Sequence, residues 1–220
     1  MRQHYCGLFI RSDEKSDDTI CTNDLISVSL KKDFDWQAKK IMATLYFTRH
    51  GQTVWNVENK ICGATDIDLT DSGHQQAIEL GNIILEKGYK IDEILSSPLI
   101  RARKTAEHIS EVTGIPMRIE MRLTEQNFGK YESTARDGEE FKAAKAQFVN
   151  SYQGGESMLR LAQRIYNLLD DIKSQAGSKN YLLVAHNGIA RVVNSYFCDM
   201  SNDEYAAFGI KNCQILRYDF

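Results

Sequence analysis

The sequence predicts an α/β fold in three layers, with a mostly parallel central sheet between two layers of helices. Two short apolar runs, residues 45–48 and 181–185, are typical of buried parallel strands. Segments with helical apolar periodicity alternate with these runs. Each run is followed by a histidine and then by a turn with glycine, so His50 and His186 are expected at strand ends. In open α/β sheets, ligands bind where the carboxyl ends of the strands meet.

The composition fits this fold and excludes several classes of function. The chain has 220 residues, of which 42% are hydrophobic, enough for one sizeable core or one domain with a tail. A net charge of −3 argues against a general surface for nucleic acid or anionic membranes. No apolar run is long enough to cross a bilayer, and no secretory signal is found. The five cysteines are scattered without C-x-x-C spacing, which favours reduced thiols and a cytoplasmic location.

The first 41 residues differ from the rest of the chain. They contain a charged run at 13–18 and one isolated strand candidate at 25–30. We expect either a disordered or loosely docked extension, or a chain whose biological start is Met42. In both cases the domain boundary is predicted near residue 41, with the functional domain at 42–220.

The first two helices after the opening strand are predicted from their end signals. Thr70 is typical of an N-cap, and a helix over 72–87 is expected to end at Gly88. A strand at 91–96 follows. Ser97 then predicts a cap and Pro98 the first position of a second helix. Arg101 falls near the start of that helix, where a cation opposes the helix dipole, which suggests a bound anion nearby.

The second half of the chain completes the alternation. Residues 117–120 are a strand candidate, and a short helix is possible over 139–148. The strongest helical stripe runs from Met158 to Ile172. The strand at 181–185 and a helix at 189–197 follow, and residues 213–220 predict an edge or closing strand.

Four chemically capable side chains follow different predicted strands or begin the helix after one. They are His50, Arg101, Glu125 and His186. The topology would bring them into one crevice together with Arg49. Arginines bind phosphoryl oxygens, a neutral histidine can attack phosphorus, and a glutamic acid can protonate a leaving oxygen. Each residue alone also fits a plain structural role, Glu125 as a solvated loop carboxylate, so the prediction depends on the combination.

Three segments in this order resemble the histidine phosphatase superfamily, also called phosphoglycerate-mutase-like. They are Arg-His-Gly-Gln-Thr-Val-Trp-Asn at 49–56, Ser-Ser-Pro-Leu-Ile-Arg-Ala at 96–102 and Ala-His-Asn-Gly at 185–188. The resemblance covers about residues 43–220. It implies the three-layer fold and an enzyme that needs no metal or other cofactor. Residues 123–129, which contain Glu125, resemble the acid-bearing loop of the family's phosphatase branch.

The resemblance also implies a role for each site residue. The family's first histidine becomes phosphorylated, which assigns that role to His50. Arg49, Arg101 and His186 would form the phosphate pocket, and Asn56 matches an asparagine that contacts phosphate. Three further residues are expected to bind substrate, and these are Cys62, Gly63 and Asn187.

The segment after the acid loop separates the family's mutases from its phosphatases. Glycolytic mutases carry a longer insert there with two adjacent arginines, whereas residues 130–155 contain only Arg136. We therefore expect a metal-independent phosphomonoesterase that acts on a small phosphorylated metabolite. A phosphoglycerate mutase with a trimmed insert and a catalytically weak phospholigand-binding protein are the alternatives. Loops at 57–66 and 126–155 would set the specificity, without naming the substrate. The oligomeric state stays open, a homodimer being one option.

Overall fold

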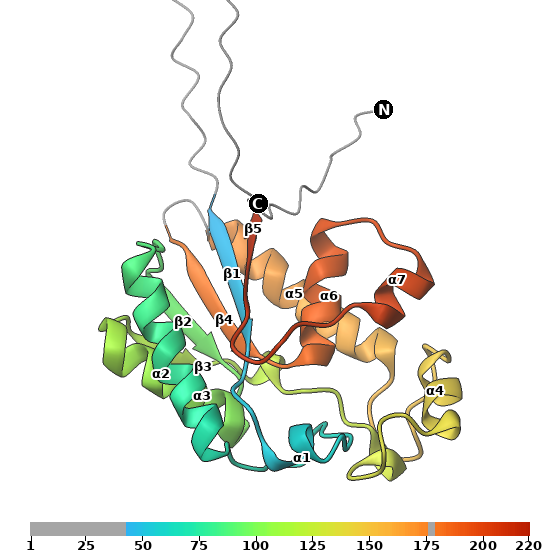
Figure 1. Cartoon of the computed structure of the whole chain (residues 1–220). Coiled ribbons are helices and arrows are strands. Elements are labelled where there is room, and N and C mark those ends of the chain that lie inside the picture. Colours follow the sequence, from blue (N-terminus) through green and yellow to red (C-terminus); the bar gives the residue numbers. More distant parts are fainter. Residues whose placement is uncertain (1–42, 176–178) are drawn as a thin grey trace, which may run out of the picture. The chain divides into compact units, whose positions relative to one another are not determined.

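A five-stranded sheet forms the centre of the domain (Figure 1). The computed structural model describes residues 43–175 and 179–220, so the predictions for residues 1–41, including the strand at 25–30, lie outside the described residues. The strands run in the order β3-β2-β4-β1-β5. Their bounds are β1 Thr44–Arg49, β2 Glu93–Ser96, β3 Met117–Ile119, β4 Tyr181–Ala185 and β5 Ile215–Asp219.

The pairing of the strands confirms the predicted mostly parallel sheet. β1, β2, β3 and β4 pair in parallel with their neighbours, and β5 closes one edge antiparallel to β1. Leu45 lies opposite Tyr181 and Arg49 opposite Ala185, so β1 and β4 end together. This register places His50 and His186, each one residue further along, at the same edge of the sheet.

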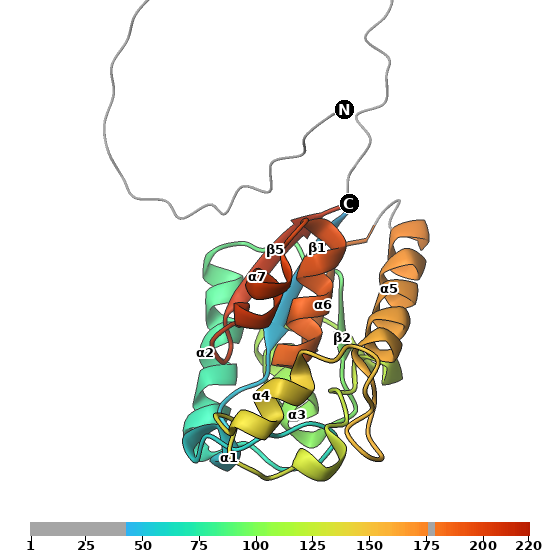
Figure 2. The same ribbon diagram turned by 90° about the vertical axis from the view of Figure 1, so that its right-hand side faces the viewer.

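Helices cover both faces of the sheet, as the three-layer prediction requires (Figures 1 and 2). α2 (Asp71–Glu86) and α3 (Ile100–Thr113) pack on one face, and α5 (Met158–Gln175) and α6 (Asn187–Phe197) on the other. Strand alternation fills both interfaces, since Leu45 and Phe47 join the α5–α6 core while Tyr46 joins the α2–α3 core. Burying both faces explains why the strand sequences are continuously apolar.

The end signals of α2 are confirmed, whereas those of α3 are wrong by two residues. Thr70 Oγ1 accepts a hydrogen bond from the Gly73 amide, and Gly88 has a φ of 63° just after the helix. α3 begins at Ile100 with Leu99 as its N-cap, not at Pro98. The Ser97 hydroxyl instead accepts from the Leu99 amide at 3.3 Å, just before the helix, and lies 2.8 Å from Nε2 of His186.

The remaining elements are short: α1 (Val54–Val57), η1 (Met121–Leu123), η2 (Gly129–Tyr131), α4 (Glu139–Lys145) and α7 (Asn202–Ala207). Of these, α1 and α4 lie toward the end of the sheet where β1 and β4 finish (Figure 1). α4 is three residues shorter than the predicted helix. A third apolar cluster, which includes Phe128, Tyr131, Phe141 and Tyr152, holds α4 against the acid loop. Within the described ranges, no helix has the length and apolar character needed to span a membrane.

Candidate active site

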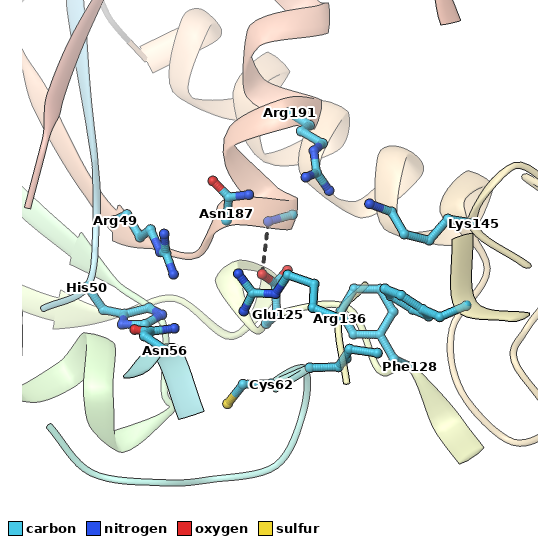
Figure 3. Close-up of a pocket in the computed structure, with 13 residues that line it drawn as sticks. Arg49, His50, Asn56, Cys62, Glu125, Phe128, Arg136, Lys145, Asn187 and Arg191 are labelled. Atoms are coloured by element: carbon cyan, nitrogen blue, oxygen red, sulfur yellow. Dashed lines mark hydrogen bonds between the residues drawn. The ribbon is translucent and has the colours of Figure 1, made fainter. Parts of the chain in front are cut away.

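A cavity of about 100 Å³ lies where β1 and β4 end, and we call it the strand-end cavity (Figure 3). It brings together six of the residues that the sequence singled out, Arg49, His50, Asn56, Cys62, Glu125 and Asn187. Its other lining residues are Ile61, Phe128, Arg136, Phe141, Lys145, Gly188 and Arg191. Arg101, Gly63 and His186 do not line it. The predicted convergence on one crevice is therefore found, with three of the predicted residues set back from its wall.

His50 is held as a neutral imidazole with one free nitrogen. Its Nδ1 lies 2.7 Å from the carbonyl oxygen of Gly51. A carbonyl only accepts, so Nδ1 carries the proton and Nε2 keeps its lone pair. Burial lowers the pKa of His50 well below its usual value, and the nearby Arg101 and Arg49 lower it further. These are the properties that a nitrogen nucleophile needs.

Gly51 is required for a close contact, not for the sharp turn that its position suggests. Its φ is not positive, but a Cβ here would lie 2.3 Å from the carbonyl oxygen of Gly73. Gly73 stands in the first turn of α2 and meets Gln52 just as closely. The two glycines let α2 approach the chain directly after His50, which helps to fix the position of the ring.

Arg49 presents a guanidinium to the cavity with part of its hydrogen-bonding capacity unused. Nη1 donates to the carbonyl oxygen of Ile210 at 3.0 Å, while the buried Nε has no partner among the described residues. Burial lowers the pKa of Arg49 to about 10, with a further contribution from nearby Arg136. Arg49 stays charged at neutral pH. An anion in the cavity would offset both the cost of burying this charge and its repulsion by Arg136.

Two asparagine side chains that line the cavity have their amide oxygens fixed by backbone donors. Asn56 Oδ1 accepts from the Thr53 amide at 3.1 Å, and Asn187 Oδ1 accepts from the Ile210 amide at 2.9 Å. A backbone amide can only donate, so each oxygen is fixed and each Nδ2 is left to donate elsewhere. Asn212, for which the sequence offers no signal, links the His50 carbonyl oxygen to Asn56.

Arg101 and His186 are almost completely buried beside the cavity. The two terminal nitrogens of Arg101 donate to the carbonyl oxygens of Thr65 at 2.8 Å and Gly63 at 2.7 Å, while its Nε has no partner in the described structure. The rings of His186 and His50 lie 5.2 Å apart. Burial lowers the pKa of His186 well below its usual value, with Arg101 contributing. The bonds of Arg101 to the loop at 63–65 therefore explain in part why a cation stands near the start of α3.

Glu125 is a buried side chain, and its interpretation as a solvated loop carboxylate is wrong. Only 5% of its surface is exposed. Its two oxygens accept from the amides of Gln126 and Gly188, both at 2.9 Å, and Figure 3 shows the bond from Gly188. Gly188 lies in the first turn of α6, and a Cβ there would meet Glu125 Oε1 at 2.4 Å. Because Gly188 has no side chain, the carboxyl group of Glu125 has room at the cavity wall.

A family model described as histidine phosphatase superfamily (branch 1) matches residues 45–220. The chain belongs to the histidine phosphatase superfamily. This confirms the resemblance seen in the three motifs, together with the three-layer fold and membership of a phosphatase family.

Several known members of the superfamily are similar to this chain over most of its length. Probable phosphoglycerate mutase GpmB of Erwinia tasmaniensis is 33% identical over 185 residues, which cover 81% of this chain and 85% of the relative. The protein of the same name from Escherichia fergusonii is 33% identical over 186 residues, covering 81% and 86%. A mycobacterial glucosyl-3-phosphoglycerate phosphatase shares the fold, with a TM-score of 0.70 at 24% identity, covering 80% of this chain and 89% of the other.

In this histidine phosphatase, one carboxylate ties the loop at 57–66 to the loop at 123–129 that contains Glu125. Glu132 accepts from the amides of Gly63, Ala64, Thr65 and Phe128 and from the Thr65 hydroxyl, at 2.7–3.4 Å. Gly63 is therefore set in the loop backbone, where a Cβ would lie 2.2 Å from Glu132. Cys62 does line the cavity, but burial raises the pKa of its thiol to about 11, so it is neutral and a poor nucleophile.

Three cations of the cavity were not predicted from the sequence as site residues. They are Arg136 in a loop, Lys145 at the end of α4 and Arg191 in α6. Arg191 follows Asn187 by four residues, so helical periodicity could have placed both on one face. None of the three forms an ion pair within the part of the chain that the structure describes. Burial, together with the nearby Arg191 and Arg136, lowers the pKa of Lys145 to about 8.

Metal-binding side chains do not gather at this site. The described residues hold no group of three or more histidine, cysteine, aspartate or glutamate side chains that could bind a metal ion. Charge stabilisation by the protein's own side chains would have to come from the guanidinium, ammonium and amide groups around His50.

Proposed function

We propose that this enzyme is a metal-independent phosphomonoesterase that hydrolyses a small phosphorylated metabolite through a phosphohistidine at His50. The observation that carries the proposal is the geometry of that ring. Its Nδ1 proton is bound to the Gly51 carbonyl, and Nε2 is left unprotonated beside a cavity rich in cations. A neutral nitrogen placed this way can attack phosphorus without first losing a proton.

In the first step His50 Nε2 forms a bond to phosphorus while the bond from phosphorus to the ester oxygen breaks. Arg49 and the amide of Asn56 bind the phosphoryl oxygens, since both line the cavity with unused donors. Arg101 adds positive charge, and its Nε and the Nδ1 of His186, which have no partner among the described residues, are further buried groups that can contact the phosphoryl group. Their role is to stabilise negative charge in the transition state.

Glu125 serves both halves of the reaction. As an acid it gives its proton to the ester oxygen, so the leaving group departs as an alcohol. The resulting carboxylate then takes a proton from water, which attacks the phosphohistidine, and inorganic phosphate leaves with His50 restored. Hydrogen bonds from Gln126 and Gly188 hold the carboxyl group in position and leave lone pairs for this proton transfer.

Phosphoglycerate mutase activity is the second candidate, because two observations favour it. The two GpmB relatives carry that name at 33% identity. In addition, Arg136, Lys145 and Arg191 supply the charge for a substrate carboxylate from three separate elements. The absence of two adjacent arginines in residues 130–155 is thus a weaker argument against a mutase than the sequence alone suggests. We retain hydrolysis as the proposal because residues 130–155 lack the longer insert that the glycolytic mutases carry there.

Trapping of the covalent intermediate tests the proposal. Label from a phosphorylated substrate should remain on the protein in alkali, be lost in acid, and be absent from His50→Ala. Label that is lost in alkali would indicate a serine or aspartate nucleophile and would overturn the mechanism. A protein that binds phosphate esters but never acquires label would be a binding protein.

The balance between hydrolysis and transfer needs its own measurement. We expect inorganic phosphate to be released from phosphoglycerate faster than 2- and 3-phosphoglycerate interconvert. Efficient interconversion that requires priming by bisphosphoglycerate would replace the phosphatase assignment with the mutase. A panel of phosphorylated metabolites assayed in parallel would then identify the best substrate.

A further inference from the structure

A second cavity adjoins the strand-end cavity and shares four lining residues with it. This α4–α7 chamber has a volume of about 350 Å³ and lies between α4 and α7. The shared residues are Arg136, Phe141, Lys145 and Arg191. Arg49 and His50 line only the strand-end cavity, so the three shared cations stand at the junction, away from the nucleophile. A ligand could extend from His50 past these cations into the chamber.

The junction holds more positive charge than one phosphate group requires. Among the described residues, four cations and one carboxyl group, that of Glu125, line the strand-end cavity. A phosphate monoester carries close to two negative charges at neutral pH. When Glu125 holds the proton that it will donate, two positive charges are left without a counter-charge. Burying unpaired cations is costly, so a second anionic group on the ligand is the natural partner.

The three cations keep donors free on the side of the cavity. Arg191 Nε donates to the Phe208 carbonyl at 2.7 Å, and Arg136 Nη2 donates to the Lys60 carbonyl at 3.0 Å. These bonds fix each guanidinium and leave its other nitrogens available. In Figure 3, Arg191 and Lys145 extend toward the same space from α6 and α4. A carboxylate or second phosphate between them would receive charge-assisted hydrogen bonds from more than one element.

Beyond the junction the chamber is mainly apolar. Half of its lining residues are aromatic or aliphatic, Phe141, Ala146, Phe148, Met158, Tyr205 and Ala206. The Tyr205 hydroxyl lies 2.8 Å from the sulfur of Met158, so that polar group is already occupied. Two charged residues line the chamber beyond the junction: Lys142, which is already paired with Glu139, and Asp203 on α7, which would repel a second acid. The acid therefore belongs at the junction and an apolar group belongs further in.

We propose that the substrate of this site is a phosphomonoester whose leaving group carries both a second acidic group and an apolar group. The acid binds Arg136, Lys145 and Arg191, and the apolar group occupies the α4–α7 chamber. This substrate class rests on the proposed phosphoryl transfer to His50. It is narrower than a phosphorylated hydroxy acid, because the apolar group contributes to specificity as well.

Three synthetic esters separate the two features. Phospholactate has the acid without a large apolar group, 1-phenylpropan-2-yl phosphate has the ring without the acid, and phosphophenyllactate has both. We expect kcat/KM for phosphophenyllactate to exceed that for either of the others by about tenfold or more. Charge-assisted hydrogen bonds and burial of a phenyl ring each supply an effect of about that size. p-Nitrophenyl phosphate serves as the reference for phosphoryl transfer itself.

Variants assign each advantage to its part of the site. Lys145→Gln should reduce the preference for phosphophenyllactate over 1-phenylpropan-2-yl phosphate, and Lys173→Gln, the same charge change on exposed α5 surface, should not. Ala206→Trp, which fills the chamber, should reduce the preference for phosphophenyllactate over phospholactate. Ala207→Trp is its control, since Ala207 is exposed on the same helix but does not line the chamber.

The outcomes distinguish this proposal from the proposed function. If p-nitrophenyl phosphate is hydrolysed through His50 while the three esters react at similar kcat/KM, the second-anion and apolar subsites are refuted and the phosphatase stands. Preferences that persist unchanged in Lys145→Gln and Ala206→Trp refute the assigned positions. If no ester is hydrolysed and His50 acquires no label, the proposed function fails and this substrate class fails with it.

Discussion

Replacing Glu132 by glutamine should loosen two loops at once. The carboxylate accepts five hydrogen bonds, four from backbone amides and one from the Thr65 hydroxyl. Oε1 accepts two of them, from Ala64 and Phe128, and Oε2 accepts the rest. A glutamine keeps one oxygen and turns an NH2 group toward donors. In the better of its two orientations, the NH2 group takes the place of Oε1. The two bonds at that position are then lost, and the NH2 group faces two other N–H donors.

The cost follows from the number and type of bonds lost. Hydrogen bonds to charged groups contribute about 1.5–3 kcal/mol each. Glu132 is half-buried and water competes for it, so we take the lower value and expect a loss of about 3 kcal/mol for two bonds. For a domain of this size, about 2–4 °C of Tm is lost per kcal/mol, which gives a decrease of roughly 6–12 °C.

Activity should fall as well, because the loop that Glu132 holds also supplies the carbonyl partners of Arg101. Those partners are Gly63 and Thr65, both bound to Glu132 through their amides. The measurement is Tm together with kcat/KM at 25 °C, where the variant is still folded. Glu140→Gln makes the same charge change at a largely exposed ion pair with Lys130, and its Tm should stay close to that of the wild type. A Glu132→Gln protein with wild-type Tm, or with lowered Tm but unchanged kcat/KM, would refute the coupling between the loops.

Four further predictions concern the proposed chemistry. Glu125→Gln should slow single-turnover phosphorylation of His50 by about 10²–10⁴-fold with an alkyl phosphate and far less with p-nitrophenyl phosphate, whose leaving group needs no proton; equal losses would exclude Glu125 as the acid. His50 and His186 are buried with lowered pKa, so below pH 6.5 the unfolded chain binds protons that the folded chain does not, and stability should fall with falling pH. His50→Gln should remove about 1.4 kcal/mol per pH unit from that slope in denaturant titrations, and an unchanged slope would show that His50 is not held neutral. Lys145, with a pKa near 8 and facing Arg136, Arg191 and Glu125, should lose its proton as pH rises, so KM for phosphophenyllactate should increase above about pH 8 in the wild type but not in Lys145→Arg. Turnover should survive exhaustive chelation, and recovery only with added Mg²⁺ or Zn²⁺ would contradict the metal-independent mechanism.

The strands and their ends could be predicted because the signals are local. Continuous apolar runs mark β1 and β4, and the histidine after each run lies where the parallel register puts it. The three-layer arrangement then follows from the alternation of strands and amphipathic helices. The same logic predicts that Arg49 and Glu125 meet at this edge of the sheet, and both line the strand-end cavity.

What the sequence could not indicate depends on contacts between distant segments. The burial of Glu125 requires Gly188, which lies 63 residues away and leaves room for the carboxyl group. Ser97 has the appearance of a helix cap, yet α3 begins two residues later than expected and the Ser97 hydroxyl contacts His186, 89 residues away. Arg136 and Lys145 come from a loop and a short helix, whose positions depend on the apolar cluster around Phe141.

The carboxylate of Glu132 also divides the site into a part that is hard to alter and a part that is free to vary. Besides its five bonds, backbone pairing joins residues 59–61 to 133–136, so the loops on both sides behave as one unit. α4 is attached mainly through ring contacts of Phe141, and its Lys145 reaches the cavity from outside that unit. Insertions, deletions or exchanges between residues 137 and 150 could therefore give a new leaving-group preference while the groups around His50 keep their positions. Protein engineers who seek a new substrate for this enzyme should begin with α4 and leave the loops tied to Glu132 unchanged.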